Sequence, residues 1–361
     1  MDVLGFTTLI PLLPVLAAKF HASTSLMGAA LSTSALFATI CSPLWGSLSD
    51  RYGRKMALQS SQLCSLIGYV TIALSGGIVT LFIARAISGL GGGNLGVAES
   101  YIADITAPDD RERAYAWSSA AFGAGFVVGP VLAGQLLRIG PFAPFWAAAL
   151  FEAVNLILTQ LFISSKTARR RERVDLLAIF RHKGVLNLLA RQFLYIFAYT
   201  YFFGIFSLYL AKALSVGPEE SSVLLGVAGA VGAVVLVTAA DKVAKRFGQE
   251  ALVSGAFALA AISFIAMAFV HSVAMFVPVL IVWAAAGAAL RPTLDAMLSR
   301  EAPEEARGAV LGVADALNNA SMIVGPVAGG LVLERSVRLV GALPALCCAV
   351  GLFLGFRRKP S

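Results

Sequence analysis

The sequence predicts an all-α integral membrane protein whose twelve transmembrane helices form two pseudo-symmetric six-helix bundles. First, 58% of the residues are hydrophobic and only 13% are charged, whereas a soluble globular protein carries about 25% charged residues. Second, a spanning helix needs ~20 apolar residues, or ~30 with its connection, so 361 residues hold about twelve spans. Third, short motifs recur in the second half of the chain at a nearly fixed offset.

Apolar runs between charged and turn residues locate the spans. The first run covers only ~25 Å at 1.5 Å per residue, against a hydrocarbon core of ~30 Å. We therefore expect the first helix to be truncated, with Asp2 deeper in a longer native chain. The expected spans are residues 2–18, 26–47, 56–75, 78–103, 115–137, 143–164, 187–211, 220–240, 251–270, 273–299, 308–333 and 338–356.

Lysine and arginine lie mostly on one side of these spans. The connections on that side hold twenty basic residues and those on the opposite side hold five. Because cytoplasmic loops carry the excess of basic residues, we expect a multi-pass protein of a bacterial inner membrane with both termini in the cytoplasm. The net charge of +8 is then a signal of topology in a lipid bilayer, and we expect no nucleic-acid partner.

The two halves repeat one plan. Gly129-Pro130 recurs as Gly325-Pro326 after 196 residues, and Ala107-Pro108 recurs as Ala302-Pro303 after 195. Parallel repeats about an axis normal to the membrane place a binding site near the midplane between the halves, which is the architecture of a rocking transporter. The expected parts are an N-terminal bundle (residues 1–164), a cytoplasmic basic linker (165–186) and a C-terminal bundle (187–361).

The sequence contains no catalytic or metal-binding constellation. The four cysteines lie in apolar runs, where a thiol behaves as a small hydrophobe, and the three histidines lie far apart, in or beside predicted loops. There is no C-x-x-C or Cys/His metal spacing, and no nucleophile–base pair or phosphate-cradling loop is visible. We therefore expect no enzymatic activity, no cofactor and no metal.

The connection between the second and third spans carries the most specific motif. Its residues Gly46-Ser47-Leu48-Ser49-Asp50-Arg51-Tyr52-Gly53-Arg54-Lys55 resemble the motif of the major facilitator superfamily between helices 2 and 3. The resemblance implies a cytoplasmic latch that closes when the transporter faces outward. Gly46 would let helices approach closely and Gly53 would permit the tight turn. The expected latch residues are Gly46, Asp50, Arg51, Gly53, Arg54 and Asp104, with Arg54 pairing with Asp104. A solvated basic turn is the alternative.

Two further motifs resemble those of the same superfamily. Gly125-x3-Gly129-Pro130 with Gly134 resembles its antiporter motif, and Gly325-Pro326 with Gly330 repeats it. The resemblance implies proton-driven export, while plain small-residue packing is the alternative. Arg85-x3-Gly89-x-Gly91 resembles the helix 4 motif. A charge at depth costs ~2.5–3.5 kcal/mol, so we expect Arg85 to face the cavity and modulate a proton-binding carboxylate. A static ion pair is the alternative.

Other intramembrane polar residues are few. Glu99 and Asp295 are 196 residues apart, and Arg291 precedes Asp295 by one helical turn. We hypothesise a proton-sensitive gate in which protonation weakens ion pairs; snorkelling or a fixed pair is the alternative. Asp315, Asn318 and Asn319 share one helix face for substrate contact or interhelical hydrogen bonds. Glu152 has no explanation at this level. The predicted proton and substrate pathway comprises Asp2, Arg85, Glu99, Arg291, Asp295, Asp315, Asn318 and Asn319.

Within the superfamily, the chain resembles drug:proton antiporters of the tetracycline-exporter type over most of its length. The resemblance rests on Asp2-Val3-Leu4-Gly5, on Tyr101-Ile102-Ala103-Asp104-Ile105-Thr106 and on Ala296-Met297-Leu298-Ser299-Arg300. Some positions depart from this resemblance. Gly68 stands where tetracycline exporters carry an acid. Glu99 and Arg291 stand where the resemblance implies neutral residues, and Asp295 stands where it implies an amide. The resemblance implies transport, but it does not imply tetracycline as the substrate.

These patterns predict a monomeric secondary active transporter that exports an amphipathic small molecule or drug in exchange for protons by alternating access. Proton-coupled uptake or symport of a sugar or organic anion is the alternative, because Arg85 and Arg291 could hold an anion. A membrane enzyme is the alternative from a different class, and the missing catalytic constellation argues against it.

Overall fold

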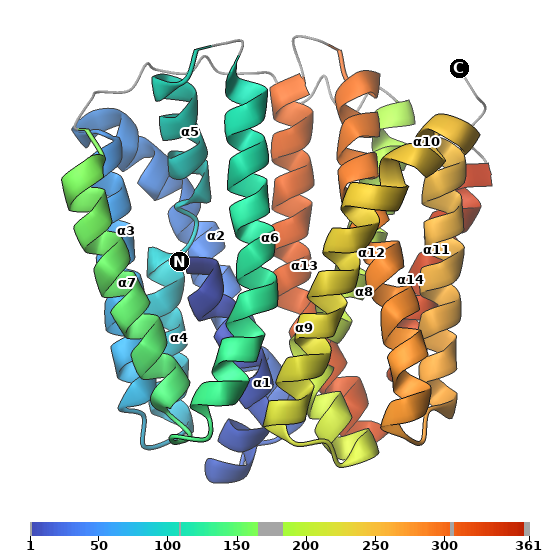
Figure 1. Cartoon of the computed structure of the whole chain (residues 1–361), viewed down its shortest axis with the longest axis horizontal. Helices are drawn as coiled ribbons and strands as arrows, with labels where there is room; N and C mark the ends of the chain where they lie inside the picture. Colours follow the sequence, from blue (N-terminus) through green and yellow to red (C-terminus); the bar gives the residue numbers. More distant parts are fainter. Residues whose placement is uncertain (1, 108–109, 165–182, 304–306, 357–361) are drawn as a thin grey trace. The chain divides into compact units, whose positions relative to one another are not determined.

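The structure is a computed structural model that describes residues 2–107, 110–164, 183–303 and 307–356. Within these ranges, the side chains of residues 2–6, 112, 122, 183, 239–241 and 307–309 are also outside the description. Most of the predicted basic linker and the side chain of Asp2 therefore lie outside the described residues. All regular secondary structure in the described chain is helical (Figure 1).

Each of the first six expected spans corresponds to a helix or a broken helix. α1 begins partway along its neighbours, and it contains Pro11 and Pro14 (Figure 1). The helices are α1 (Asp2–Lys19), α2 (Thr24–Tyr52), α3 (Arg54–Ala73), α4 (Ile78–Gly91), α5 (Leu95–Ile105), α6 (Arg111–Leu136) and α7 (Ala143–Phe162).

The last six expected spans are likewise helical. A π-helical segment at Leu236–Ala240 continues α9 into α10, and a short 3₁₀ turn at Met267–Phe269 follows α11. The helices are α8 (Lys183–Leu214), α9 (Pro218–Val235), α10 (Asp241–Phe247), α11 (Gln249–Ala266), α12 (Val273–Glu301), α13 (Arg307–Arg335) and α14 (Ala342–Phe356).

Two local features differ from the expectation. The continuous span expected over residues 78–103 breaks between α4 and α5, because Gly93 takes a φ of +79° that L side chains rarely adopt. The connection after residue 240, expected as a loop, forms the seven-residue helix α10. Neither feature changes the number of membrane crossings.

The helices are suited to a lipid environment. Nine helices in the described part of the chain are long and apolar enough to cross a membrane, and Thr7–Lys19 and Ala342–Phe356 are shorter apolar helices. With the twenty-residue α3, this set is consistent with the twelve expected spans. Large apolar side chains such as Phe162, Val237 and Phe356 are mostly exposed, which suits lipid-facing positions and would be a liability in water.

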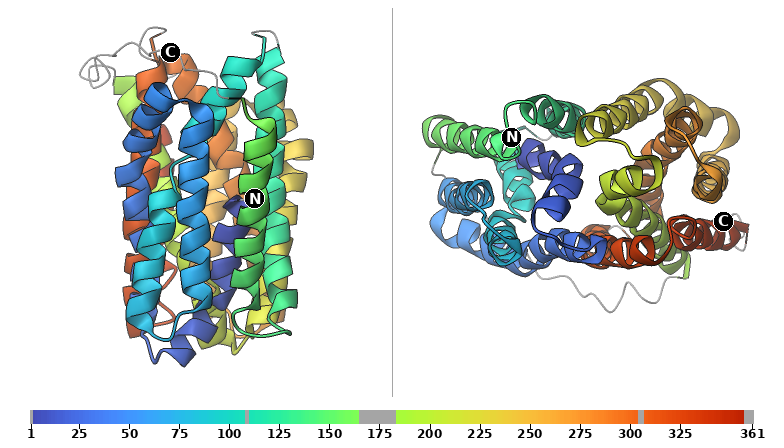
Figure 2. Two further views of the ribbon diagram at one scale, coloured as in Figure 1. Left: turned by 90° about the vertical axis from the view of Figure 1, so that its left-hand side faces the viewer. Right: turned by 90° about the horizontal axis from the view of Figure 1, so that it is seen from below.

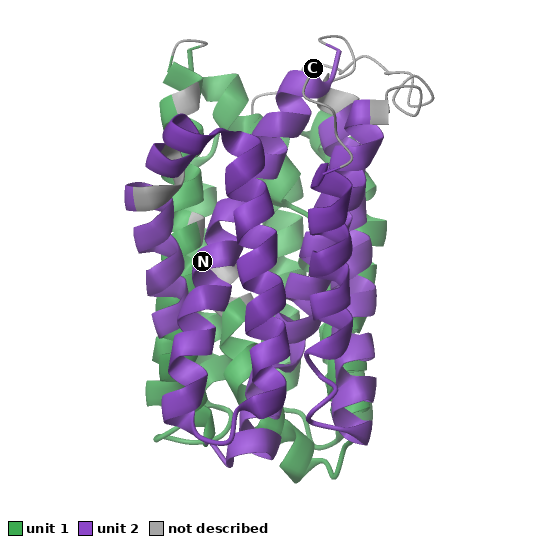
Figure 3. Cartoon of the chain, turned by 90° about the vertical axis from the view of Figure 1, so that its right-hand side faces the viewer, with its two compact units in different colours: residues 1–171, 217–226 green, residues 172–216, 227–361 purple. Residues whose placement is uncertain are grey.

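The chain divides into two compact units (Figure 3). Unit 1 comprises residues 1–171 and 217–226, and unit 2 comprises residues 172–216 and 227–361. Helices α1 to α7 thus belong to unit 1, most others belong to unit 2, and α9 is divided between them. Within each unit the helices run side by side along a common direction (Figure 2).

Different side chains pack the two units. In unit 1, small residues let α3 and α4 approach closely, and α3 also packs against α7. In unit 2, α8 supplies an aromatic core: the rings of Tyr199 and Trp283 stack with centroids 5.2 Å apart, and Phe202 meets Trp283 edge-on at 5.4 Å. The aromatic residues of α8 therefore pack in a core.

Candidate functional site

The turn between α2 and α3 gathers the acidic and basic residues of the expected latch. Arg54 is buried at the start of α3. Its Nε donates to Asp104 Oδ2 at 2.9 Å, and its Nη1 donates to Asp50 Oδ1 at 3.1 Å and to Ser49 Oγ at 2.7 Å. The expected pair of Arg54 with Asp104 therefore forms, and it joins the ends of α2, α3 and α5.

The other latch residues have distinct positions. Gly53 has a φ of +96°, so the turn requires a residue without a side chain. A Cβ placed on Gly46 would meet no atom within 4 Å, so the expected close approach of helices at Gly46 is wrong: the space beside it is open. Arg51 is exposed and lies over the ring of Tyr52, 5.2 Å from the centroid.

Arg85 is buried on α4, only 2% exposed. Among the side chains that the structure describes it forms no ion pair, and its Nε and Nη2 have no hydrogen-bond partner. Its guanidinium interacts electrostatically with Tyr69 of α3. The side chain is therefore buried, and no ion pair with an acid whose side chain the structure describes holds it.

Glycines on α3 and α4 explain one departure from the tetracycline exporters. A Cβ on Gly68 would lie 2.7 Å from Ser88 N and 2.8 Å from Ser88 Cα. Gly89 is similarly close to Ser34 O, at 2.5 Å, and Gly91 abuts Ser61 and Ser65. The backbones of α3 and α4 thus leave no room for an acidic side chain at position 68.

The glycine–proline motifs of α6 and α13 lie at close helix contacts. On α6, a Cβ at Gly134 would lie 2.7 Å from Ser222 Cβ of α9, and Gly125 O accepts from Thr7 Oγ1 at 3.4 Å. On α13, a Cβ at Gly325 would lie 2.9 Å from Tyr201 N of α8. Helices therefore pack closely at Gly134 and at Gly325. The remaining motif residues, all buried, are Gly129, Pro130, Pro326 and Gly330.

A charged cluster in unit 2 brings together three predicted pathway residues. Arg291 Nε lies 3.9 Å from Asp295 Oδ2 on α12, with both side chains about half exposed. Gln192 Nε2 of α8 donates to the other carboxylate oxygen, Asp295 Oδ1, at 2.7 Å. Asp315 of α13 interacts electrostatically with Arg291 and Asp295. One arginine, one amide and two carboxylates thus meet at the junction of α8, α12 and α13.

The other predicted pathway residues do not join this cluster. Glu99 is exposed on α5 in unit 1, where Tyr115 Oη donates to its backbone carbonyl at 3.4 Å. Asn318 and Asn319 are half-buried, one turn along α13 from Asp315. The side chain of Asp2 lies outside the described residues.

Sequence reasoning missed two polar residues of the interior, Gln192 and Arg191, and left a third, Glu152, unexplained. Gln192 was overlooked because a glutamine is not charged. Arg191 is fully buried on α8, and its Nη1 contacts Glu250 Oε1 at 2.6 Å, joining α8 to α11. Glu152 is buried on α7. An ionisable residue inside an apolar run indicates a buried functional or structural site in a membrane protein. Arg191 and Glu152 both carry this signal in the sequence.

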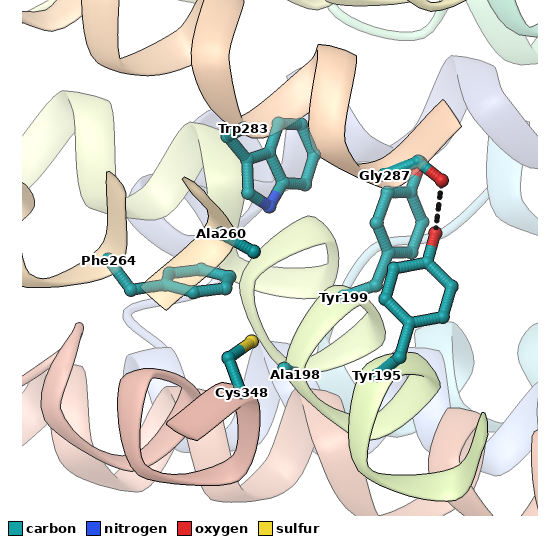
Figure 4. Close-up of a pocket in the computed structure, with 8 residues that line it drawn as sticks. All are labelled: Tyr195, Ala198, Tyr199, Ala260, Phe264, Trp283, Gly287 and Cys348. Carbon is teal, nitrogen blue, oxygen red and sulfur yellow. Dashed lines mark hydrogen bonds between the residues drawn. The ribbon is translucent and has the colours of Figure 1, made fainter. Parts of the chain in front are cut away.

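Unit 2 also contains an aromatic pocket (Figure 4). Tyr195 and Tyr199 of α8, Phe264 of α11, Trp283 of α12 and Cys348 of α14 contribute to its lining, and Tyr195 Oη donates to Gly287 O at 2.9 Å. Its volume of about 10 Å³ is near the smallest that holds one water molecule. The pocket is therefore a packing gap and is too small for a drug-sized substrate.

Known proteins resemble this chain along its whole length. Tetracycline resistance protein, class C, of Escherichia coli is 31% identical over 376 residues, covering 98% of this chain and 94% of that protein. Multidrug resistance protein 2 of Bacillus subtilis (strain 168) is 26% identical over 368 residues, covering 97% and 90%.

Solved structures share the fold. The nucleoside transporter NupG has a TM-score of 0.82 with 14% identity, covering 98% of both chains. The human organic anion transporter MFSD10 has a TM-score of 0.70 with 20% identity, covering 98% of this chain and 96% of that one. The sequence model of the Major Facilitator Superfamily matches residues 1–238 and 188–361. The chain therefore belongs to the Major Facilitator Superfamily, as an all-helical multi-pass membrane transporter and not an enzyme.

Proposed function

We propose that this protein exports an amphipathic small molecule or drug across the bacterial inner membrane in exchange for protons. The observation that carries the proposal is the 31% identity to tetracycline resistance protein, class C, over 98% of the chain. The similarity to a multidrug resistance protein supports the broader substrate class. The alternative of sugar or organic-anion uptake receives no comparable support from these resistance proteins.

In this proposal a monomer with both termini in the cytoplasm alternates between two conformers. The N-terminal and C-terminal six-helix bundles (residues 1–164 and 187–361) rock about a central substrate site. Arg54 and its partners Ser49, Asp50 and Asp104, here called the Arg54 cluster, join the cytoplasmic ends of α2, α3 and α5, so these helices move as one body. The burial of the Arg54 side chain supports this role, because breaking its three hydrogen bonds would leave a buried guanidinium without these partners.

Asp295 is proposed as the proton-sensitive member of the unit 2 cluster, with Glu99 as its counterpart in the other half. A negative Asp295 attracts Arg291, whereas a neutral one releases it and shifts the balance between conformers. Asp295→Asn keeps an oxygen for Gln192 but removes the charge. We expect both Asp295→Asn and Glu99→Gln to weaken proton-driven efflux in vesicles. If both variants kept full coupled transport, the gate would be wrong.

A drug-susceptibility panel in an efflux-deficient bacterial host tests the function. Expression of the chain should raise resistance to tetracycline, to planar cationic dyes such as ethidium, or to both. Arg85→Ala should remove that resistance, whereas Arg138→Ala should retain it, because Arg138 is exposed and pairs with Glu219 at the surface. Equal membrane levels of the variants must be verified by fluorescence of a fused reporter. Unchanged susceptibility across the panel would contradict drug export.

A further inference from the structure

Unit 1 buries an acid that the proposed cycle does not use. Glu152 is 1% exposed and lies nine residues from the start of α7 and ten from its end. At 1.5 Å per residue it is ~14 Å from either end, near the middle of a ~30 Å hydrocarbon core. An ionisable side chain at that depth is costly, and such residues commonly carry protons or ions through transporters.

The pairing of α3 with α7 brings Tyr69 level with Glu152. Gln62 Nε2 of α3 donates to Thr159 Oγ1 of α7 at 2.9 Å. Gln59, earlier on α3, meets Gln160, later on α7, so the two helices run in opposite directions. Tyr69 lies seven residues, or two helical turns, after Gln62 on α3, and Glu152 lies seven residues before Thr159 on α7. Two turns bring a residue back to the same side of its helix, so Tyr69 and Glu152 lie on the sides of α3 and α7 that contact each other.

Tyr69 also connects to the buried Arg85. Tyr69 is 6% exposed, and its hydroxyl interacts electrostatically with the Arg85 guanidinium across the tight α3–α4 contact. A phenol hydroxyl can accept a hydrogen bond from a guanidinium while donating its own hydrogen to a carboxylate. Arg85, Tyr69 and Glu152 therefore make a polar line across α4, α3 and α7 inside unit 1.

The helices packed against α7 are α3, α1 and α6. By the register of Gln62 with Thr159, Tyr69 is the titratable group of α3 that lies level with Glu152. The other titratable or charged groups on these helices, within the described side chains, have other positions or partners: Arg54 at Asp50 and Asp104, Lys55 at Gln160 O, Cys64 beside Cys41, Lys19 over Phe142, Tyr115 at Glu99 O, and Arg111 and Arg113 in the first turn of α6.

We propose that Glu152 is a proton-binding carboxyl of the transport cycle, linked to Arg85 through the Tyr69 hydroxyl; this rests on the proposed proton-driven export. When Glu152 is ionised, Tyr69 donates to the carboxylate and accepts from Arg85, and the line holds three helices together. One proton taken up by the carboxylate gives the neutral acid, which weakens the attraction along the line. Release of that proton restores it.

Infrared difference spectroscopy of the purified protein in lipid nanodiscs tests the proton site without any substrate. All spectra are recorded on protein that also carries Asp295→Asn, which silences the other proposed proton site, and between acidic and alkaline buffer they should contain the carbonyl band of a protonated buried carboxyl. Glu152→Gln should lose that band, Glu152→Asp should retain it at a shifted frequency, and Tyr69→Phe should shift its titration midpoint. Glu219→Gln, at an exposed ion pair, is the control and should leave the band in place.

Transport measurements then separate proton coupling from a structural role. In proteoliposomes, Glu152→Gln should lose tetracycline or ethidium efflux driven by a pH gradient but should retain exchange of the same compound at equal pH. A band of the Asp295→Asn parent that persists in Glu152→Gln would overturn the proposal, and so would a Tyr69→Phe spectrum identical to that of the parent. If wild type transports neither compound, the proposed function fails, while the infrared result still decides whether Glu152 binds a proton.

Discussion

At the scale of single residues, the chain buries charges where soluble proteins rarely do. Arg54 has two carboxylate partners, Arg191 has Glu250, and Arg85 lies enclosed beside Tyr69. The pair of Arg54 with Asp104 could be predicted, because a motif of high specificity supplied both positions. The partner of Arg191 could not be predicted from the sequence, because Glu250 lies at the start of a helix, where an acid is expected to be on the surface.

The Arg54 cluster predicts a measurable difference between two ion pairs of similar length. Asp104→Asn can keep an acceptor oxygen for Arg54 but removes the negative charge that faces the buried guanidinium, so we expect a loss of about 1–3 kcal/mol in unfolding free energy. Glu219→Gln breaks the exposed pair with Arg138 and should cost less than about 1 kcal/mol. Thermal melting of both variants in one detergent makes the comparison. Equal shifts in Tm would show that burial of Arg54 adds nothing.

At the scale of elements, small residues decide which helices touch. The long contact of α13 with α8 depends on Gly325 and Gly329, whose Cα atoms face the α8 backbone. The sequence marked these positions as a motif, but periodicity alone could not name α8 as the partner. The break after α4 was missed for a related reason: glycines within an apolar run read equally well as packing or as a bend.

A matched pair of glycines on α13 tests this packing. Gly325→Ala would place a Cβ 2.9 Å from Tyr201 N and 2.7 Å from Thr200 Oγ1, and overpacking against backbone should cost about 1–3 kcal/mol. Gly312→Ala on the same helix meets no atom within 4 Å and should gain up to about 1 kcal/mol of helix propensity. Melting curves should therefore move in opposite directions. A Gly325→Ala variant as stable as wild type would contradict the close α8–α13 contact.

At the scale of the whole molecule, both the membrane-spanning helices and the duplication of the fold could be predicted from the sequence. Apolar length predicted the helices, because an isolated backbone in lipid must be helical, and the motif offsets indicated duplication. The buried polar residues Gln192 and Glu152 were harder to assign, because their partners lie on helices distant in sequence. Their roles depend on which helix faces meet, and hydropathy does not encode those faces.

Proton movement caused by substrate tests the central claim most directly. Everted membrane vesicles containing the protein are acidified inside by respiration, and the pH gradient is followed with a fluorescent amine dye. Adding an exported drug from the susceptibility panel to the outside should dissipate the gradient, because antiport moves drug inward and protons outward. Vesicles carrying Arg138→Ala should respond alike, and vesicles without the protein should not respond. A deeper gradient on adding substrate would indicate symport, and an unchanged gradient while the drug accumulates would contradict proton-coupled export.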